Sequence, residues 1–283
     1  MELAYRILNV FTVAEERLSG NPLCVFEDGS GLSPARMQAL ARQLHLSETT
    51  FLLPPESPGA SAQVRIFTPD FEMPFAGHPT LGTAHVVRSL RDAGDEIVLE
   101  MPAGLVLVRG RGDRWTLTTA RPPATRPAAP PDVLAGMLGL PRGSVFQPLW
   151  VDTGSQQLVV PVRSVDDVRA ARPDPRLLAL HGRAPDGAET LAYVFAEGKG
   201  GEVEARFFFL SDGGVFEDPA TGSACANLGG WLLATGAPLP ARRVISQGAA
   251  VKRPSRLVLD VDAERSIHVT GDVVELGRGT MRI

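Results

Sequence analysis

Two short stretches of this sequence share an unusual make-up, and together they constrain the fold more than any other feature. They read FEMPFAGHPTLG at residues 71–82 and FEDPATGSA at residues 216–224. Each begins with Phe-Glu, turns through glycine and proline, and enters a helix-like run of small residues with little charge. A chain that uses this pattern twice is expected to be built from two related halves.

The elements expected around these stretches repeat in the same order. Alternating apolar and β-branched residues favour strands, whereas apolar side chains three or four residues apart favour helices. Aligning Arg65-Ile66-Phe67 with Arg206-Phe207-Phe208 brings Ala76 opposite Ala220 after a three-residue insertion. The expected strands cover residues 4–13, 21–26, 49–53, 63–67, 96–101, 105–109, 115–119, 149–152, 157–161, 191–195, 204–210, 243–246 and 256–261, and the expected helices 34–44, 80–90, 165–171 and 224–234.

A proline-rich segment separates the two halves. Residues 122–131 contain five prolines, which is typical of a linker. We therefore expect a first half at residues 1–126, joined by the C-terminal segment 272–283, and a duplicated second half at residues 127–271. Each half should have strands on both sides of one central helix.

The composition favours a globular protein that does not bind nucleic acid. The net charge of the 283 residues is -4, and no run of Lys or Arg marks a surface for nucleic acid. Glu2 stands where a signal peptide needs positive charge, and the most apolar segment, residues 224–237, is too short to span a bilayer. We therefore expect a cytoplasmic protein with no nucleic-acid or membrane partner.

The cysteines and histidines do not form a metal-binding pattern. Cys24 and Cys225 are the two cysteines, and they are too far apart in sequence for a disulfide framework or a paired ligand motif. The five histidines show none of the short spacings that hold zinc. We therefore expect no metal ion.

The beginnings of the two central helices are candidate anion sites. The first turn of a helix carries backbone N–H groups without intrahelical acceptors, and the helix dipole places positive charge there. Together these features attract a carboxylate. Two such helix beginnings facing one cleft would form a pocket for a small acid.

Several motifs resemble the phenazine-biosynthesis isomerase family (PhzF-like). They occur in the family's order over nearly the whole chain, as Ser19-Gly20-Asn21-Pro22, Leu46-Ser47-Glu48-Thr49-Thr50-Phe51, Ala76-Gly77-His78-Pro79-Thr80-Leu81-Gly82, residues 151–158, residues 217–224, and Gln247-Gly248 with Arg253-Pro254-Ser255. The resemblance implies an α+β fold like that of diaminopimelate epimerase. In that fold two pseudo-symmetric domains each wrap a β-barrel-like sheet around a central helix, with the active site between them. It also implies a homodimer.

The resemblance further decides what the cysteines can do. The family is similar to amino-acid racemases and epimerases that place one thiol at each helix mouth, but here those positions are Ala76 and Ala220. Alanine can act as neither acid nor base, so inversion by two thiols is disfavoured. Cys24 and Cys225 lie away from both mouths in the sequence and do not replace the missing thiols.

The catalytic residues implied by the resemblance are Glu48, His78 and Asp218, with Gly77, Gly222 and Ser223 binding the substrate. Glu48 would shuttle the proton, and its alternative role is a solvated glutamate at a helix end. His78 would hydrogen-bond the substrate or assist the proton's path, the alternative being a core or capping histidine. Asp218 would hold a substrate amino group or help the proton relay, the alternative being a helix cap before Pro219. Gln247 reads as a hairpin end without a catalytic role.

The expected function is therefore a cofactor-independent isomerase that moves a proton within a small substrate bearing a carboxylate. The family's named member isomerises trans-2,3-dihydro-3-hydroxyanthranilate on the way to phenazines, and the resemblance does not by itself transfer that substrate. Two alternatives remain open. One is an epimerase, racemase or dehydratase of amino or hydroxy acids, and the other is a binding protein that keeps the fold without catalysis.

Overall fold

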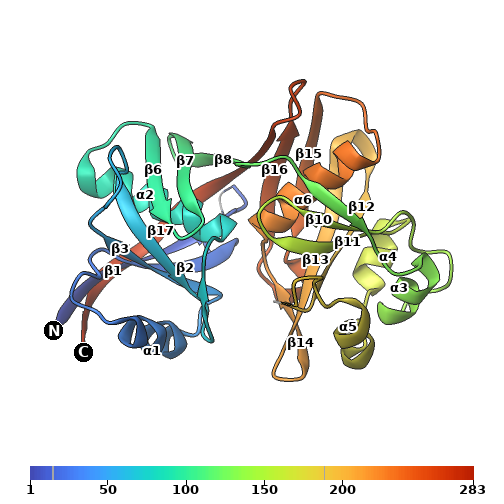
Figure 1. Ribbon diagram of the computed structural model, residues 1–283, viewed down its shortest axis with the longest axis horizontal. Helices are drawn as coiled ribbons and strands as arrows, with labels where there is room; N and C mark the ends of the chain where they lie inside the picture. Colours follow the sequence, from blue (N-terminus) through green and yellow to red (C-terminus); the bar gives the residue numbers. More distant parts are fainter. Residues whose placement is uncertain (15, 188) are drawn as a thin grey trace. The chain divides into compact units, whose positions relative to one another are not determined.

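The computed structural model describes residues 1–14, 16–187 and 189–283 and divides into two compact units (Figure 1). Unit 1 comprises Met1–Thr118 and Thr270–Ile283, and unit 2 comprises Thr119–Val269. None of the helices in the described ranges is long and apolar enough to span a membrane. The segment 119–126 belongs to unit 2, because the strand β9 (Ala124–Pro127) within it pairs with β10 (Leu149–Asp152).

Unit 1 is a closed barrel. Its strands pair in the ring order β17, β1, β2, β3, β4, β6, β7, β8, and β8 returns to β17. The pairs β2–β3 and β4–β6 are parallel. The bounds are β1 (Glu2–Val10), β2 (Asn21–Phe26), β3 (Glu48–Leu53), β4 (Ala62–Phe67), β6 (Glu96–Met101), β7 (Gly104–Arg111), β8 (Arg114–Thr118) and β17 (Ile267–Arg282), with the short β5 (Glu72–Met73) beside β4.

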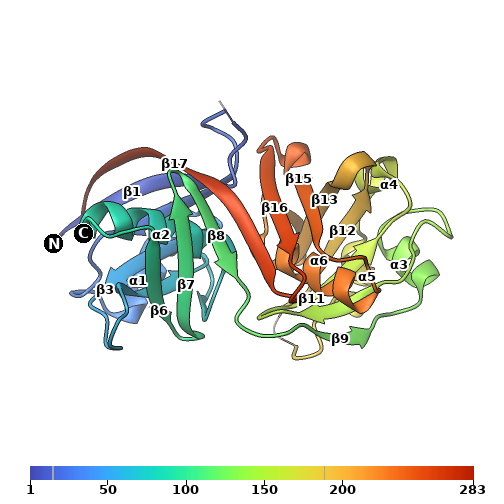
Figure 2. The same cartoon turned by 90° about the horizontal axis from the view of Figure 1, so that it is seen from above.

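The last strand of the chain joins the first. Figure 2 shows β17 running beside β1 towards the neighbouring chain ends, and Glu2 pairs with Arg282 in this antiparallel register. The amino group of Met1 donates a 2.8 Å hydrogen bond to the carbonyl of Ile283. The C-terminal segment is thus part of unit 1.

The helix α2 (Gly77–Arg91) occupies the interior of this barrel. It contacts β1, β2, β3, β6, β7 and β8, and its first eight residues are all buried. Small side chains are required there, because a Cβ atom on Gly82 would lie 2.5 Å from Cδ2 of Leu23. The low bulk that the sequence shows after His78 therefore reflects a helix enclosed by strands.

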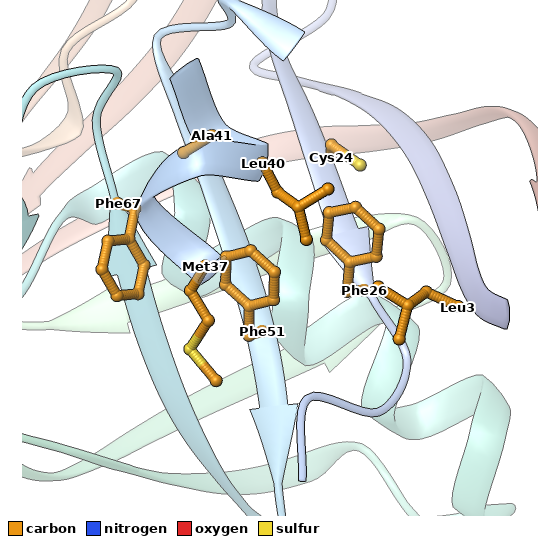
Figure 3. Packing of buried hydrophobic residues seen from close by; sticks show 8 residues of the cluster. All are labelled: Leu3, Cys24, Phe26, Met37, Leu40, Ala41, Phe51 and Phe67. Atoms are coloured by element: carbon orange, nitrogen blue, oxygen red, sulfur yellow. The ribbon is translucent and has the colours of Figure 1, made fainter. Parts of the chain in front are cut away.

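The helix α1 (Pro34–Leu44) covers the outer surface of the same barrel. Ser33 caps it and Pro34 begins it, as the sequence predicts. Its buried residues pack on aromatic side chains from the strands (Figure 3), so that the cluster comprises Leu3, Cys24, Phe26, Met37, Leu40, Ala41, Phe51 and Phe67. The rings of Phe26 and Phe51 stack with centroids 4.9 Å apart.

Unit 2 repeats the strand pairing of unit 1. The antiparallel pair β10–β11 is followed by the parallel pair β11–β12, the antiparallel β12–β13–β14, the parallel pair β13–β15 and the antiparallel pair β15–β16. The bounds are β11 (Gln156–Pro161), β12 (Leu191–Glu197), β13 (Glu202–Ser211), β14 (Gly214–Asp218), β15 (Ala241–Gln247) and β16 (Ser255–Val261). The central helix α6 (Gly222–Ala234) follows β14 as α2 follows β5, and it contacts β9, β10, β11 and β16.

The register of the strands supports the alignment of the halves in detail. Phe67 pairs with Glu72 in unit 1, and Phe208 pairs with Glu217 in unit 2. On the other side, Phe67 pairs with Thr49 and Phe208 pairs with Ala192. The residue before each partner is Glu48 in unit 1 and the buried Leu191 in unit 2, so Leu191 occupies the position of Glu48. The predicted α+β fold with two duplicated barrel-like halves is confirmed.

Some predicted boundaries are wrong. Both central helices begin earlier than predicted, at Gly77 rather than residue 80 and at Gly222 rather than residue 224. The predicted linker contains β9 and the start of α3 (Pro131–Met137), because pairing with β10 orders a proline-rich segment whose own side chains are exposed. The other helical elements of unit 2 are α4 (Val165–Ala170), α5 (Pro175–His181), η1 (Lys199–Gly201) and η2 (Ala249–Val251), of which only α4 was predicted.

Candidate active site

The structure brings Glu48 and His78 into contact at one end of the barrel of unit 1. Oε2 of Glu48 lies 3.3 Å from Nε2 of His78, with the two side chains 16% and 5% exposed, respectively. Glu48 is the first residue of β3, and His78 lies in the first turn of α2. The predicted proton carrier therefore has a histidine beside it and retains a small opening to solvent.

The strand β2 fixes the position of this pair. β2 runs parallel to β3 with Leu23 opposite Glu48, so that the first residues of β2 lie next to the first residue of β3. His78 forms a hydrogen bond with the backbone of Pro22. Proline has no N–H group, so the imidazole donates to the Pro22 carbonyl, and because Nε2 faces Glu48, the donor is Nδ1.

The burial of His78 determines where a proton resides in this pair. Burial lowers the pKa of His78 to about 3, because the imidazolium would be removed from water. A neutral imidazole with its hydrogen on Nδ1 presents a lone pair at Nε2. An ionised carboxylate at 3.3 Å would place a second acceptor opposite that lone pair. A proton on Glu48 would resolve this conflict, because it would give the contact a donor.

This arrangement predicts the protonation state of His78. Its imidazole should remain neutral, with hydrogen on Nδ1, from about pH 8 to about pH 5, whereas a free histidine side chain titrates near pH ~6.5. Long-range proton–nitrogen correlation spectra of the protein labelled with ¹⁵N-histidine, with His78→Gln as the assignment control, report both properties. A signal of His78 that titrates in this range, or hydrogen on Nε2 alone, would contradict the proposed geometry.

Asp218 is the candidate acidic residue of unit 2. It is the last residue of β14, and its carboxylate accepts a 2.5 Å hydrogen bond from the hydroxyl of Thr221. Gln247, which is buried, donates to the Asp218 carbonyl at 2.9 Å and to Oγ1 of Thr221 at 3.0 Å. The loop between β14 and α6 is thus held by a glutamine to which the sequence alone assigned no role.

The first turns of α2 and α6 both leave backbone amides available to a ligand. Their N-cap residues, Ala76 and Thr221, make no capping hydrogen bond through a side chain. The N–H groups of Gly77 and Gly222 have no acceptor within their helices. Together with the positive end of the helix dipole, these amides favour a carboxylate.

The cysteines take no part in this chemistry. Cys24 lies in the apolar cluster beneath α1, and burial raises the pKa of its thiol to about 12. Burial likewise raises the pKa of Cys225, which is inside α6 and fully enclosed. Neither thiol can ionise near neutral pH, so neither replaces the thiols absent at Ala76 and Ala220.

The predicted site residues therefore form two groups. Glu48, His78 and Gly77 belong to unit 1, and Asp218, Gly222 and Ser223 belong to unit 2. Within the part of the chain that the structure describes, no group of three or more His, Cys, Asp or Glu residues could hold a metal ion. Sequence reasoning missed four residues that orient the side chains of these groups, namely Pro22, Gln157, Asn227 and Gln247. For the last three, the available signal was a side-chain amide on an otherwise apolar strand or helix.

Comparison with known proteins places the chain among isomerases. The sequence model of the family described as "Phenazine biosynthesis-like protein" matches residues 8–279. The chain is 38% identical over 285 residues to trans-2,3-dihydro-3-hydroxyanthranilate isomerase of Pseudomonas aeruginosa, covering 97% of this chain and 98% of that protein. It is 37% identical over 290 residues to an uncharacterized isomerase of Pasteurella multocida, covering 98% and 93%.

A solved structure shows the same fold. The crystal structure of a PhzF-family phenazine biosynthesis protein of Bacillus anthracis matches with a TM-score of 0.84 over 100% of both chains, at 22% sequence identity. The family match spans both halves, including the residues around Glu48, His78 and Asp218. The chain therefore belongs to the phenazine biosynthesis-like (PhzF) family and is an isomerase.

Proposed function

We propose that this isomerase moves a proton within a small carboxylate-bearing substrate by acid–base chemistry, without a cofactor, and that Glu48 carries the proton. The observation that supports this most strongly is the 3.3 Å contact between Glu48 and the buried, neutral His78. A protonated glutamate in that contact can donate to one substrate carbon. The carboxylate that remains faces a lone pair and is therefore disposed to take a proton from another carbon.

His78 acts through Glu48 in this scheme. Its Nδ1–H is held by the Pro22 carbonyl, so Nε2 stays an acceptor throughout the reaction. An acceptor at that place favours the protonated form of Glu48 at the start and end of each turnover. The proton that the carboxylate takes from the substrate restores the acid, and His78 favours this protonated form without itself becoming charged.

The remaining site residues bind the substrate in this proposal. The amides of Gly77 and Gly222 and the hydroxyl of Ser223 would receive a carboxylate, and Asp218 would hold an amino group. A substrate with both groups is trans-2,3-dihydro-3-hydroxyanthranilate, on which the relative from Pseudomonas aeruginosa is named to act. That compound is therefore the first substrate to test.

The test is conversion of this compound in heavy water, followed by mass spectrometry and NMR of the product. Because the side chain of Glu48 is 16% exposed, its proton exchanges with solvent between turnovers, and the product should contain one deuterium at the newly protonated carbon. A product free of deuterium would contradict transfer through an exchangeable carboxyl group. Failure to convert the compound would remove it as the substrate.

The same experiment separates the alternative chemistry. A panel of amino and hydroxy acids incubated in heavy water would acquire deuterium at the α-carbon, with inversion, if the protein were an epimerase. Alanine at both thiol positions disfavours that result. Members of the panel that bind without any exchange would be excluded as substrates.

A further inference from the structure

A chain of buried amide side chains leads to Ser223 in unit 2. Nε2 of Gln157 donates to Oγ of Ser223 at 2.9 Å, and Nδ2 of Asn227 donates to Oε1 of Gln157 at 2.8 Å. Asn227 is fully buried and Gln157 is 2% exposed. Asn227 lies in the interior helix α6 and Gln157 in the strand β11. Burying two amides costs free energy unless their hydrogen bonds are made, so their arrangement calls for an explanation.

Backbone groups fix the direction of every hydrogen bond in this series of side chains. Oδ1 of Asn227 accepts from the backbone N–H of Thr153 at 2.9 Å and from the Thr153 hydroxyl at 2.7 Å. Nδ2 of Asn227 donates to the carbonyl of Ser155 at 2.9 Å. A backbone N–H can only donate and a carbonyl can only accept, so the side-chain amide of Asn227 cannot be flipped. The amide of Gln157, which accepts from Asn227, cannot be flipped either. Gln157 must therefore present its NH₂ group to Ser223.

This direction leaves Ser223 as a hydrogen-bond donor. Its Oγ atom accepts from Gln157, so its own hydrogen points elsewhere. Serine in the first turns of a helix commonly donates back to a carbonyl four residues earlier, as the hydroxyl of Thr80 does to Ala76 in α2. Among the described residues, Ser223 makes no such bond. Its hydrogen is thus available to an acceptor outside the protein.

We propose that Gln157 and Asn227 are positioning residues that hold Ser223 as a donor towards the carboxylate of the substrate. This inference rests on the proposed function, which places a carboxylate at the start of α6. The hydroxyl of Ser223 and the backbone N–H of Gly222 then both offer a hydrogen to the ligand. Together they exclude a ligand group that can only donate hydrogen bonds. Gln157 and Asn227 thereby select the acceptor character of the ligand without touching it.

The variant Gln157→Glu isolates the last link of the chain. A glutamate at 157 still accepts from Nδ2 of Asn227, but its second oxygen replaces the NH₂ group and accepts the hydrogen of Ser223. The serine then turns its lone pairs towards the ligand. We expect the affinity for 3-hydroxyanthranilate to fall roughly 10- to 100-fold, the size of one hydrogen bond to a charged group. The affinity for 2-aminophenol, which lacks the carboxylate, should change less than about twofold.

Two further variants control for charge and folding. Gln156→Glu adds the same charge at the neighbouring position of β11. The side chain of Gln156 does not belong to the hydrogen-bonded series that leads to Ser223, so both affinities should stay within about twofold of the wild-type values. Gln157→Met removes the donor without adding charge and should also reduce the preference for the carboxylate ligand. It replaces Gln157→Glu in the test if that variant does not fold. Ser223→Ala should lower the affinity, and adding Gln157→Glu to it should have little further effect.

The measurement is isothermal titration calorimetry of each variant with the two ligands. A preference for 3-hydroxyanthranilate that is lost in the Gln157 variants and kept in Gln156→Glu supports the proposal. It is overturned if Gln157→Glu keeps the preference, or if its effect is as large in the Ser223→Ala background. It is also overturned if the wild-type protein shows no preference for the carboxylate ligand. Deuterium incorporation through Glu48 does not depend on these outcomes and tests the proposed function separately.

Discussion

Replacing Glu48 with glutamine is expected to lower kcat by roughly 10²- to 10⁴-fold while the protein remains folded. Glutamine has the shape of glutamic acid, and its amide N–H can donate to Nε2 of His78, which lies 3.3 Å from Oε2 of Glu48. The contact at the mouth of the barrel therefore survives, but the amide cannot exchange protons with the substrate. Steady-state kinetics on trans-2,3-dihydro-3-hydroxyanthranilate, or on whichever substrate shows deuterium uptake, measure the effect.

A surface glutamate provides the control for this change. Glu96 of β6 forms an exposed ion pair with Arg109 of β7, so Glu96→Gln should leave kcat and the thermal unfolding midpoint nearly unchanged. If the Glu48→Gln variant retained more than about a tenth of the wild-type kcat and still incorporated deuterium, another group would have to carry the proton. A loss of activity accompanied by unfolding would be addressed by Glu48→Asp, which keeps the carboxyl group on a shorter side chain.

The second large effect concerns the stability of unit 2. Glu217→Leu is expected to lower the free energy of unfolding by ~3–5 kcal/mol, because it leaves the guanidinium of Arg206 buried without its carboxylate. The two side chains are 11% and 7% exposed, and Nη2 of Arg206 lies 2.6 Å from Oε2 of Glu217. Arg206 also donates to the carbonyl of Ala171 at 2.8 Å, at the end of α4. Urea unfolding followed by circular dichroism measures the change.

The duplication supplies the matched control. Arg65 and Glu72 form the corresponding ion pair in unit 1, with side chains 22% and 31% exposed. Since water reaches this pair, Glu72→Leu should cost only ~1 kcal/mol or less. The double variant Arg206→Met with Glu217→Leu should recover most of the lost stability, since it removes the unpaired charge. Equal effects of the two single substitutions would show that burial does not decide the strength of these pairs.

The sequence predicted those elements whose signals are local. The helix α1 has its cap, its first proline and its apolar face within eleven residues, and its bounds are as predicted. The strand β9 carries no such signal, because its four residues are exposed and only pairing with β10 orders them. The early start of α6 was missed because Gly222 and Ser223 favour turns, and enclosure of the helix by strands overrides that preference.

The site was predictable in part for the same reason. The resemblance pointed to Glu48 and His78 separately, but their contact depends on the register of β2 against β3 and on the Pro22 carbonyl, which are long-range features. The role of Gln157 likewise follows from backbone groups of Thr153 and Ser155 that no local pattern reveals. That the groups of the two units serve one substrate stays a prediction, as do the homodimer and the cytoplasmic location.

The leucine that stands in place of Glu48 in unit 2 has a stereochemical consequence. Leu191 is buried and cannot exchange protons, so on the proposed mechanism the duplicated fold carries its proton carrier in one half only. A single carboxyl group can reach only the face of the substrate that is turned towards it. The proton should therefore leave and return on the same face of the molecule, and a substrate made chiral with deuterium at the reacting carbons would yield one diastereomer of product.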